Sequence, residues 1–143
     1  MEAAKVVREQ PTRVGERLME WSRDEADVEG SWSWGPRSCL DDAWVETLHP
    51  FLREYAKKTW FQIESERTKG RRGTRVPKHF AYSVTSICQE AQDRLVELEK
   101  DDVDSVFRFR LSGRRRFYGL LREHVFMVLW WDPEHNVYPT ATN

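Results

Sequence analysis

Polar and apolar residues alternate strictly in one stretch near the C-terminus. Phe107, Phe109 and Leu111 are separated by Arg108 and Arg110. This is the period of a β-strand that has one buried face and one exposed face. The pattern predicts a strand with phenylalanines toward the core and arginines on its other side.

A turn over residues 112–114 connects this strand to a second one, since Ser-Gly is typical of turns. With a three-residue turn, Arg110 pairs with Arg116 and Arg108 pairs with Tyr118, so the phenylalanines gather on the opposite face. A two-residue turn would mix apolar and charged side chains, and a buried face specifies register strongly. The sequence therefore favours the three-residue turn.

Residues 125–131 are all apolar. Such a run is typical of an inner strand, because neither of its faces is polar. A turn over residues 122–124 would place Trp130 opposite Arg116. The same register predicts that Phe126 and Val128 also lie on the arginine face.

The first 30 residues are interpreted as an acidic N-terminal arm. The spacing of Val14, Leu18 and Trp21 predicts a short amphipathic helix in it. The arm is either a solvated extension or a cover for the arginine face, and the sequence leaves both open.

Residues 31–143 are expected to form a single α+β domain. An edge strand is predicted at residues 31–34, helical segments at residues 40–63 and a third helix after residue 83. Pro50 predicts either a kink or the start of a second helix. The predicted fold is an antiparallel meander of three or four strands, packed on one face by two or three α-helices.

Composition excludes several classes of protein. The chain has 143 residues, enough for one core, and it contains no apolar run long enough to span a membrane. Cys39 and Cys88 are interpreted as buried reduced thiols, which favours a cytoplasmic protein. The four histidines lack ligand spacing and no CxxC pair exists, so no metal site and no cofactor are expected.

Charge is distributed unevenly along the chain, although the net charge is −1. Residues 1–50 hold 6 basic and 11 acidic residues, a net of −5. Residues 51–100 hold 11 basic and 7 acidic residues, a net of +4, and residues 107–122 contain six arginines and no acid. Residues 64–78 are polar and basic, and they are interpreted as a loop that either contacts a nucleic-acid backbone or is simply solvated.

Arginines interleaved with aromatic residues favour nucleic-acid binding, because guanidinium groups bind phosphates and aromatic rings stack on bases. The alternative is a solvated arginine face, since arginine stems often cover apolar surface. The candidate RNA-binding residues are Arg108, Arg110, Tyr118, Trp130, Arg71 and Arg72.

The order of elements, and above all residues 107–135, resembles the RelE/ParE toxin superfamily of small bacterial proteins. The resemblance implies that Arg108 and Arg110 contact RNA and that Arg116 stabilises the scissile phosphate. It further implies that His135 transfers a proton, with Tyr138 as an alternative. The neighbouring Glu134 would orient His135 or act as a base.

This resemblance implies a toxin-like RNA-binding protein, and more specifically a metal-independent mRNA endoribonuclease that works at the ribosome. RNA or the ribosome and an antitoxin protein are then the expected partners, and no membrane is involved. One alternative is a non-catalytic module of the same fold that binds a protein or a nucleic acid. Another is a ParE-like inhibitor of a protein such as a topoisomerase.

Overall fold

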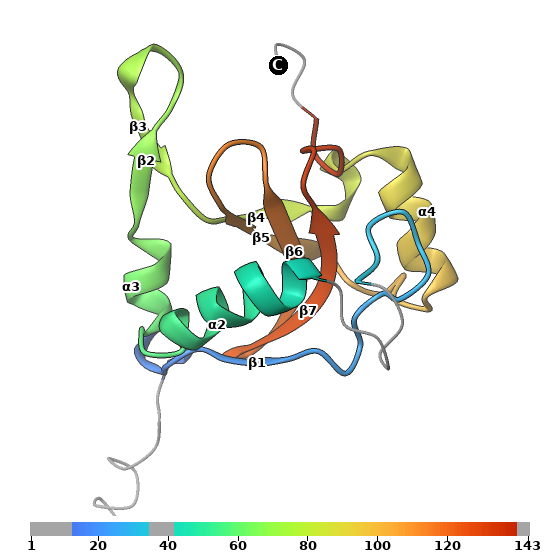
Figure 1. The fold of residues 1–143 in the computed structure, drawn as a ribbon, viewed down its shortest axis with the longest axis horizontal. Coiled ribbons are helices and arrows are strands. Elements are labelled where there is room, and N and C mark those ends of the chain that lie inside the picture. Colours follow the sequence, from blue (N-terminus) through green and yellow to red (C-terminus); the bar gives the residue numbers. More distant parts are fainter. Residues whose placement is uncertain (1–12, 35–41, 140–143) are drawn as a thin grey trace, which may run out of the picture.

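A computed structural model describes residues 13–34 and 42–139 of the chain, and Figure 1 shows them built around a central sheet. The strands are β1 (Glu20–Ser22), β2 (Arg67–Lys69), β3 (Arg75–Pro77), β4 (Phe80–Ser83), β5 (Ser105–Arg110), β6 (Arg116–Arg122) and β7 (Val125–Asp132). The helices are α2 (His49–Tyr55), α3 (Trp60–Glu64) and α4 (Gln89–Glu97). Short helical turns are η1 (Val14–Glu16), η2 (Trp44–Leu48), η3 (Arg71–Gly73) and η4 (Val84–Ser86).

The central sheet has five strands in the order β1-β7-β6-β5-β4, and β1 runs parallel to β7. The predicted antiparallel meander of three or four strands is therefore wrong as a description of the fold. Strands β5, β6 and β7 do form an antiparallel meander, but each end of it gains a strand from earlier in the chain. A second, two-stranded sheet pairs β2 with β3.

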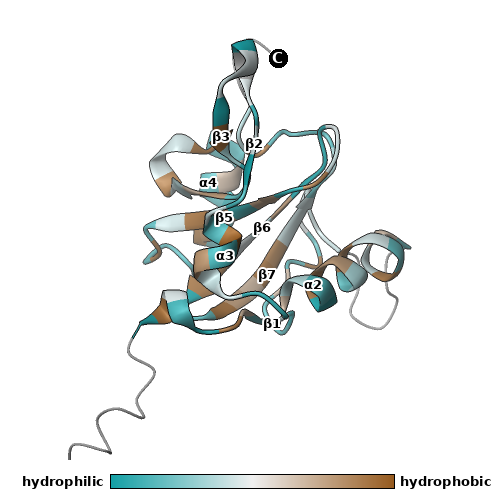
Figure 2. Cartoon of the chain, turned by 90° about the vertical axis from the view of Figure 1, so that its left-hand side faces the viewer, coloured by the Kyte–Doolittle hydropathy of each residue, from teal (hydrophilic) through white to brown (hydrophobic). Residues whose placement is uncertain are grey.

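Helices cover both faces of this sheet, not one face as predicted. On one face η2, α2 and α3 pack against the phenylalanines of β5, β6 and β7. On the other face α4 packs against a second cluster that includes Val106, Tyr118, Leu120 and Trp130. Figure 2 shows α2 and α4 on opposite sides of the strands.

The N-terminal segment pairs with the sheet and does not form the predicted amphipathic helix. A single turn, η1, precedes β1, and the backbone N–H of Glu20 donates to the carbonyl of His124 at 3.1 Å. Met19 is buried, whereas Leu18 of the predicted stripe is exposed. The open edge of β7 offers backbone hydrogen bonds that a short isolated helix cannot match.

Two other predicted elements also differ. The segment 31–34 is not a strand, although the N–H of Trp131 donates to the carbonyl of Trp32 at 2.9 Å. The basic segment 64–78 is not a plain loop, because most of it forms the β2–β3 hairpin. Gly73 and Arg72 both have positive φ at the tip of this hairpin, the conformation that such tight connections require. Cys39 lies outside the described residues, and Cys88 is a free, half-buried thiol.

The register of the β5–β6 hairpin is confirmed. Arg110 pairs with Arg116 and Arg108 pairs with Tyr118. A further backbone hydrogen bond runs from the N–H of Leu111 to the carbonyl of Arg115 at 3.0 Å.

The register predicted for β6 and β7 is wrong, because Arg116 lies opposite Asp132 and Tyr118 lies opposite Trp130. A tight turn with Glu123 at positive φ and a β-bulge at Tyr118 and Gly119 produce the difference. A bulge inserts one residue and exchanges the two faces of a strand. Because the turn has two residues, Glu123 and His124, and not the predicted three, Phe126 and Val128 pack with the phenylalanines. The bulge beyond Val128 then returns Trp130 to the predicted side.

Asp27 joins the N-terminal segment to the rest of the protein. Its carboxylate is 1% exposed and accepts two hydrogen bonds from Arg94 of α4, both at 2.8 Å. It also accepts from the indole N–H of Trp130 at 3.0 Å and from the backbone N–H groups of Glu29 and Gly30. Burial alone would raise the pKa of Asp27, but these donors outweigh it and hold the pKa at about 2.

We expect Asp27→Ala to lower the free energy of unfolding by about 1–3 kcal/mol, because it leaves the buried indole N–H of Trp130 without its acceptor and removes one of the two carboxylates that Arg94 binds. Urea denaturation followed by tryptophan fluorescence measures the loss. Glu29→Ala is the matched control in the same loop, since Glu29 is exposed, and its effect should stay within about 0.5 kcal/mol. Equal effects of the two variants would contradict this role for Asp27.

Candidate functional site

Three arginines lie on one face of the sheet at the β5–β6 turn, and we call Arg108, Arg110 and Arg116 the arginine cluster. The first two come from β5 and the third from β6, and the pairing of Arg110 with Arg116 sets their side chains on the same side. The alternation with phenylalanines explains this placement, because the core takes the apolar side of each strand.

Arg108 is held by neutral groups. Its guanidinium donates to the carbonyl of Lys78 at 2.8 Å and to the hydroxyl of Tyr82, and it lies over the Tyr82 ring with 5.3 Å to the ring centre. The ring of Tyr82 stacks on that of Tyr138, with ring centres 4.0 Å apart. The side chain is thus positioned without any charge to neutralise it.

Arg116 is held in the same manner, by the backbone of the turn. One terminal nitrogen donates to the carbonyls of Gly113 and Arg115, both at 2.9 Å. Burial and the neighbouring Arg110 and Arg108 lower the pKa of Arg116 to about 10. The group therefore keeps its proton and its charge at neutral pH.

No carboxylate forms an ion pair with the arginine cluster among residues 13–34 and 42–139. The carboxylate of Asp132, opposite Arg116 in the register, instead accepts from the backbone N–H groups of Asn136 and Val137 at 2.9 and 2.8 Å. Arg108 and Arg116 are only 6% and 5% exposed, and the Nε of each is buried with no hydrogen-bond partner in this part of the chain. Burying an unpaired charge costs several kcal/mol, so an anion bound at the accessible end of the cluster would be stabilising.

His135 follows the last strand and lies within electrostatic reach of this cluster. Its backbone has a φ of 65°, the left-handed region. Burial lowers the pKa of the half-buried His135 below its usual 6.5, and Arg116 lowers it further, while Asp132 opposes the shift. The imidazole is therefore neutral at pH 7. Glu134 does not join the group, since it is 62% exposed and its nearest cation is Arg114 at 3.6 Å.

The aromatic residues predicted to stack on bases are not at the surface. Tyr118 and Trp130 are fully buried, and the indole of Trp130 packs against Trp32 with ring centres 5.5 Å apart. Both rings lie under α4 and the N-terminal segment. The half-buried pair of Tyr82 and Tyr138 lies beside the arginines instead. The alternation of Phe80 and Tyr82 in the sequence could have indicated a strand that places Tyr82 there.

The β2–β3 hairpin carries further positive charge. It projects from the body at the same end of the molecule as the β5–β6 turn (Figure 1). Arg67, Lys69, Arg72 and Arg75 are exposed on it. Arg71, also proposed to bind RNA, directly precedes Arg72 in the turn η3.

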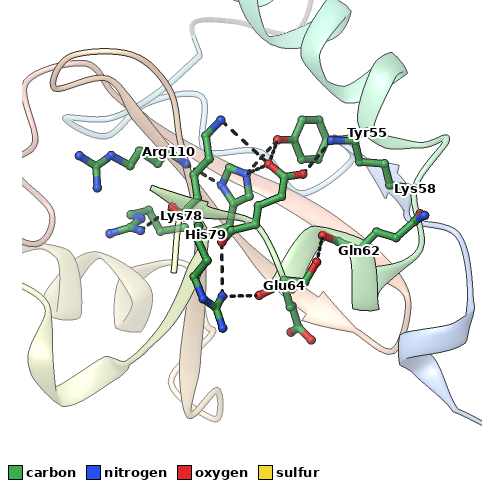
Figure 3. Close-up of polar contacts among 11 residues, drawn as sticks. Tyr55, Lys58, Gln62, Glu64, Lys78, His79 and Arg110 are labelled. Carbon is green, nitrogen blue, oxygen red and sulfur yellow. Dashed lines mark hydrogen bonds and ion pairs between the residues drawn. The ribbon is translucent and has the colours of Figure 1, made fainter. Parts of the chain in front are cut away.

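A partly buried polar network lies beneath this end of the molecule and was not anticipated from the sequence (Figure 3). The N–H of Arg110 donates to Nδ1 of His79 at 3.1 Å, so the neutral ring carries its proton on Nε2. That Nε2 lies 3.0 Å from the hydroxyl of Tyr55, which donates to Glu66 at 2.7 Å. Lys58 completes the network with an ion pair to Glu66 at 2.7 Å.

The network fixes the position of Arg110, because His79 accepts from its backbone. Burial lowers the pKa of His79 to about 4, against the opposing pull of the Glu66 charge. Burial would raise the pKa of Glu66, but hydrogen bonds from Lys58 and Tyr55 outweigh it and lower that pKa. Burial and the same carboxylate raise the pKa of Tyr55 well above its usual value.

A cleft of about 420 Å³ opens beside this network. It lies between α2, the β2–β3 hairpin and the β5–β6 turn. Its lining includes Phe51, Thr68, Lys78, Arg110, Leu111 and Ser112. Arg110 therefore belongs both to this cleft and to the arginine cluster.

Comparison with protein-family models, with curated proteins and with solved structures finds no match to this chain. Within the described ranges, no group of three or more His, Cys, Asp or Glu side chains could hold a metal ion. None of the helices described is long and apolar enough to cross a membrane.

The buried histidine makes stability depend on pH. Because the pKa of His79 is about 4 in the folded protein and 6.5 ordinarily, the unfolded chain binds a proton between these values that the folded protein does not. The free energy of unfolding should thus fall as the pH drops from 6.5 toward 4, by at most about 1.4 kcal/mol per pH unit from this group. Protonation of Glu66 adds to the loss below pH 4.5.

Urea denaturation at pH 7, 6 and 5 measures this dependence. The variant His79→Gln cannot take up the proton, so it should be less stable at pH 7 and show a shallower slope. If the free energy of unfolding fell equally steeply with pH in the wild type and in His79→Gln, the assignment to His79 would be contradicted.

Proposed function

We propose that this protein binds single-stranded RNA through the arginine cluster and the adjoining basic hairpin. The observation that carries the proposal is a set of three arginines that no carboxylate neutralises in the described chain, two of them nearly buried and held by neutral acceptors. Such fixed and uncompensated guanidinium groups match the charge and geometry of phosphates.

The distribution of charge supports a small and local interface. The whole chain has a net charge of −1, so general attraction to polyanions is weak and binding depends on this one end of the molecule. The half-buried ring of Tyr138, which stacks on Tyr82 close to Arg108, suits an unpaired base better than a duplex, in which the base faces are covered.

Replacing Arg110 should weaken RNA binding without disturbing the fold, because its guanidinium makes no ion pair within the described residues. We expect Arg110→Gln to bind a single-stranded RNA 12-mer about tenfold more weakly. The slope of log K against log salt should shrink by about 0.7 for each phosphate that the variant no longer neutralises. Fluorescence anisotropy at several salt concentrations measures both quantities.

Lys57→Gln is the control, since it also removes one positive charge, from an exposed side chain just beyond the C-terminal end of α2. It should leave both the affinity and the salt slope nearly unchanged. Equal effects of Arg110→Gln and Lys57→Gln would contradict a localised interface. A single-stranded DNA of the same sequence shows whether the 2′-hydroxyl contributes.

RNA cleavage is a second candidate function, favoured by the neutral His135 beside Arg116. A neutral imidazole can accept the proton of a 2′-hydroxyl as its oxygen attacks the adjacent phosphate. The bond from phosphorus to the 5′-oxygen then breaks, a 2′,3′-cyclic phosphate forms, and the departing 5′-oxygen takes a proton from solvent. Arg116 would stabilise the charge that develops on the phosphate oxygens. The resemblance to the RelE/ParE superfamily, which here rests on Arg108, Arg110, Arg116 and His135, extends this proposal to mRNA on the ribosome and to an antitoxin that covers the cluster.

His135→Asn tests cleavage separately from binding. Asparagine tolerates the left-handed backbone of this position but cannot accept the proton. We expect wild-type protein to cut mRNA in a reconstituted translation reaction, with cuts mapped by primer extension, and the variant to bind RNA normally without cutting. Cuts that persist in the variant, or their absence with folded wild-type protein, would remove the catalytic proposal and leave the binding proposal intact.

A further inference from the structure

The cleft between α2, the β2–β3 hairpin and the β5–β6 turn has the size and lining of a small-molecule site. Its volume of about 420 Å³ falls in the range of about 300–1,000 Å³ that is typical of ligand pockets. Its wall combines two cationic side chains with an aromatic ring and an aliphatic one. This combination suits a ligand that has both an anionic and a flat apolar part.

The cationic side of the cleft consists of Lys78 and Arg110. The ammonium group of Lys78 lies 4.0 Å from Glu66, but that carboxylate already binds Lys58 at 2.7 Å. Arg110 has no carboxylate partner in the described part of the chain. The pair therefore retains positive charge that a phosphate can neutralise.

The apolar side of the cleft is rigid. Phe51 stacks on Tyr55 with ring centres 4.1 Å apart and an angle of 13° between the rings. Its ring also meets Phe109 and Phe117 edge to face, at 5.4 Å in each case. A ring held in this way loses little conformational freedom when a ligand contacts it.

The position of the cationic side is also fixed before a ligand binds. The backbone N–H of Arg110 is anchored on buried His79 at 3.1 Å, and the carbonyl of Lys78 accepts from Arg108 at 2.8 Å. Arg110 thereby links the cleft to the arginine cluster. The sugar-phosphate backbone of one RNA strand could therefore contact both the cleft and the cluster.

We propose that this cleft binds one unpaired nucleotide, with its phosphate between Lys78 and Arg110 and its base against Phe51 and Leu111. The inference deepens the proposed function, since in an RNA strand the bound nucleotide would be one whose neighbours contact the arginine cluster. A free nucleoside monophosphate has the same chemistry, and the two sources are distinguished by experiment.

Isothermal titration with AMP and with ribose 5-phosphate tests the cleft directly. Both ligands carry the phosphate, but only AMP carries a base, so AMP should bind about tenfold more tightly. Equal affinities would overturn the proposal, because the cleft would then be recognising charge alone.

Two blocking variants test the location of the site. Thr68→Trp from β2 and Ser112→Trp from the β5–β6 turn each fill the cleft without changing its charge, and each should weaken AMP binding at least tenfold. Val96→Trp adds the same bulk at an exposed position of α4 and should have no effect. Unchanged AMP binding in both blocking variants, with their fold confirmed by circular dichroism, would overturn the proposal.

The RNA 12-mer separates this inference from the proposed function. If wild-type protein binds the RNA and the blocked variants bind it equally well, the cleft proposal fails and the RNA-binding proposal stands. If AMP binds in the cleft but the RNA binds no better than AMP, the nucleotide site stands and the RNA-binding proposal fails.

Discussion

The buried carboxylate of Asp27 is the interaction on which the arrangement of this protein depends. It receives Arg94 from α4 and Trp130 from β7, and its own backbone is bonded on both sides, since its N–H donates to Leu129 and its carbonyl accepts from Trp34. One side chain thus ties a strand, a helix and the N-terminal segment together. This arrangement depends above all on Arg94, because a fold that lost this side chain would bury a carboxylate with no cation beside it.

The arginine cluster differs from Asp27 in that its buried charges have no partner of opposite charge among the described residues. Asp27 is bonded by a guanidinium, an indole and backbone N–H groups, whereas Arg108 and Arg116 have only carbonyls and a hydroxyl. The fold therefore pairs the buried carboxylate of Asp27 with a cation and leaves two buried arginines without an anion in the part of the chain described. Local electrostatics of this kind are more informative about function than net charge, which is close to zero.

The sequence predicts local features of this fold well. The β5–β6 register follows from strict alternation, because a shift by one residue would have placed Arg108 or Arg110 in the phenylalanine core. The identity of the arginine cluster follows from the same pattern. The β2–β3 hairpin was missed because each strand has only three residues, too few to carry a periodic signal, and β2 is polar on both sides.

Features that depend on distant contacts were not predictable. The spacing of Val14 and Leu18 fits a helix, but pairing of β1 with a strand about a hundred residues later overrides it. The bulge at Gly119 places Trp130 on the opposite face of the sheet from Val128, and no local sequence pattern indicates it. A Cβ atom at Gly119 would lie 2.4 Å from the carbonyl oxygen of Met127. The need for glycine at this position is therefore evident only once the strands are paired. The burial of Trp130 likewise depends on α4 and the N-terminal segment.

The edges of the sheet have a consequence for self-association. Strand β4 is only four residues long, and it ends the sheet with Phe80 partly exposed, directly opposite Arg108 in the register. Unpaired strand edges invite a second copy to add on, and nearby positive charge discourages this by repulsion between like surfaces. Exposed basic residues lie on the β2–β3 hairpin that directly precedes β4, namely Arg67, Lys69, Arg72 and Arg75. Their charge therefore opposes the joining of two copies of this edge.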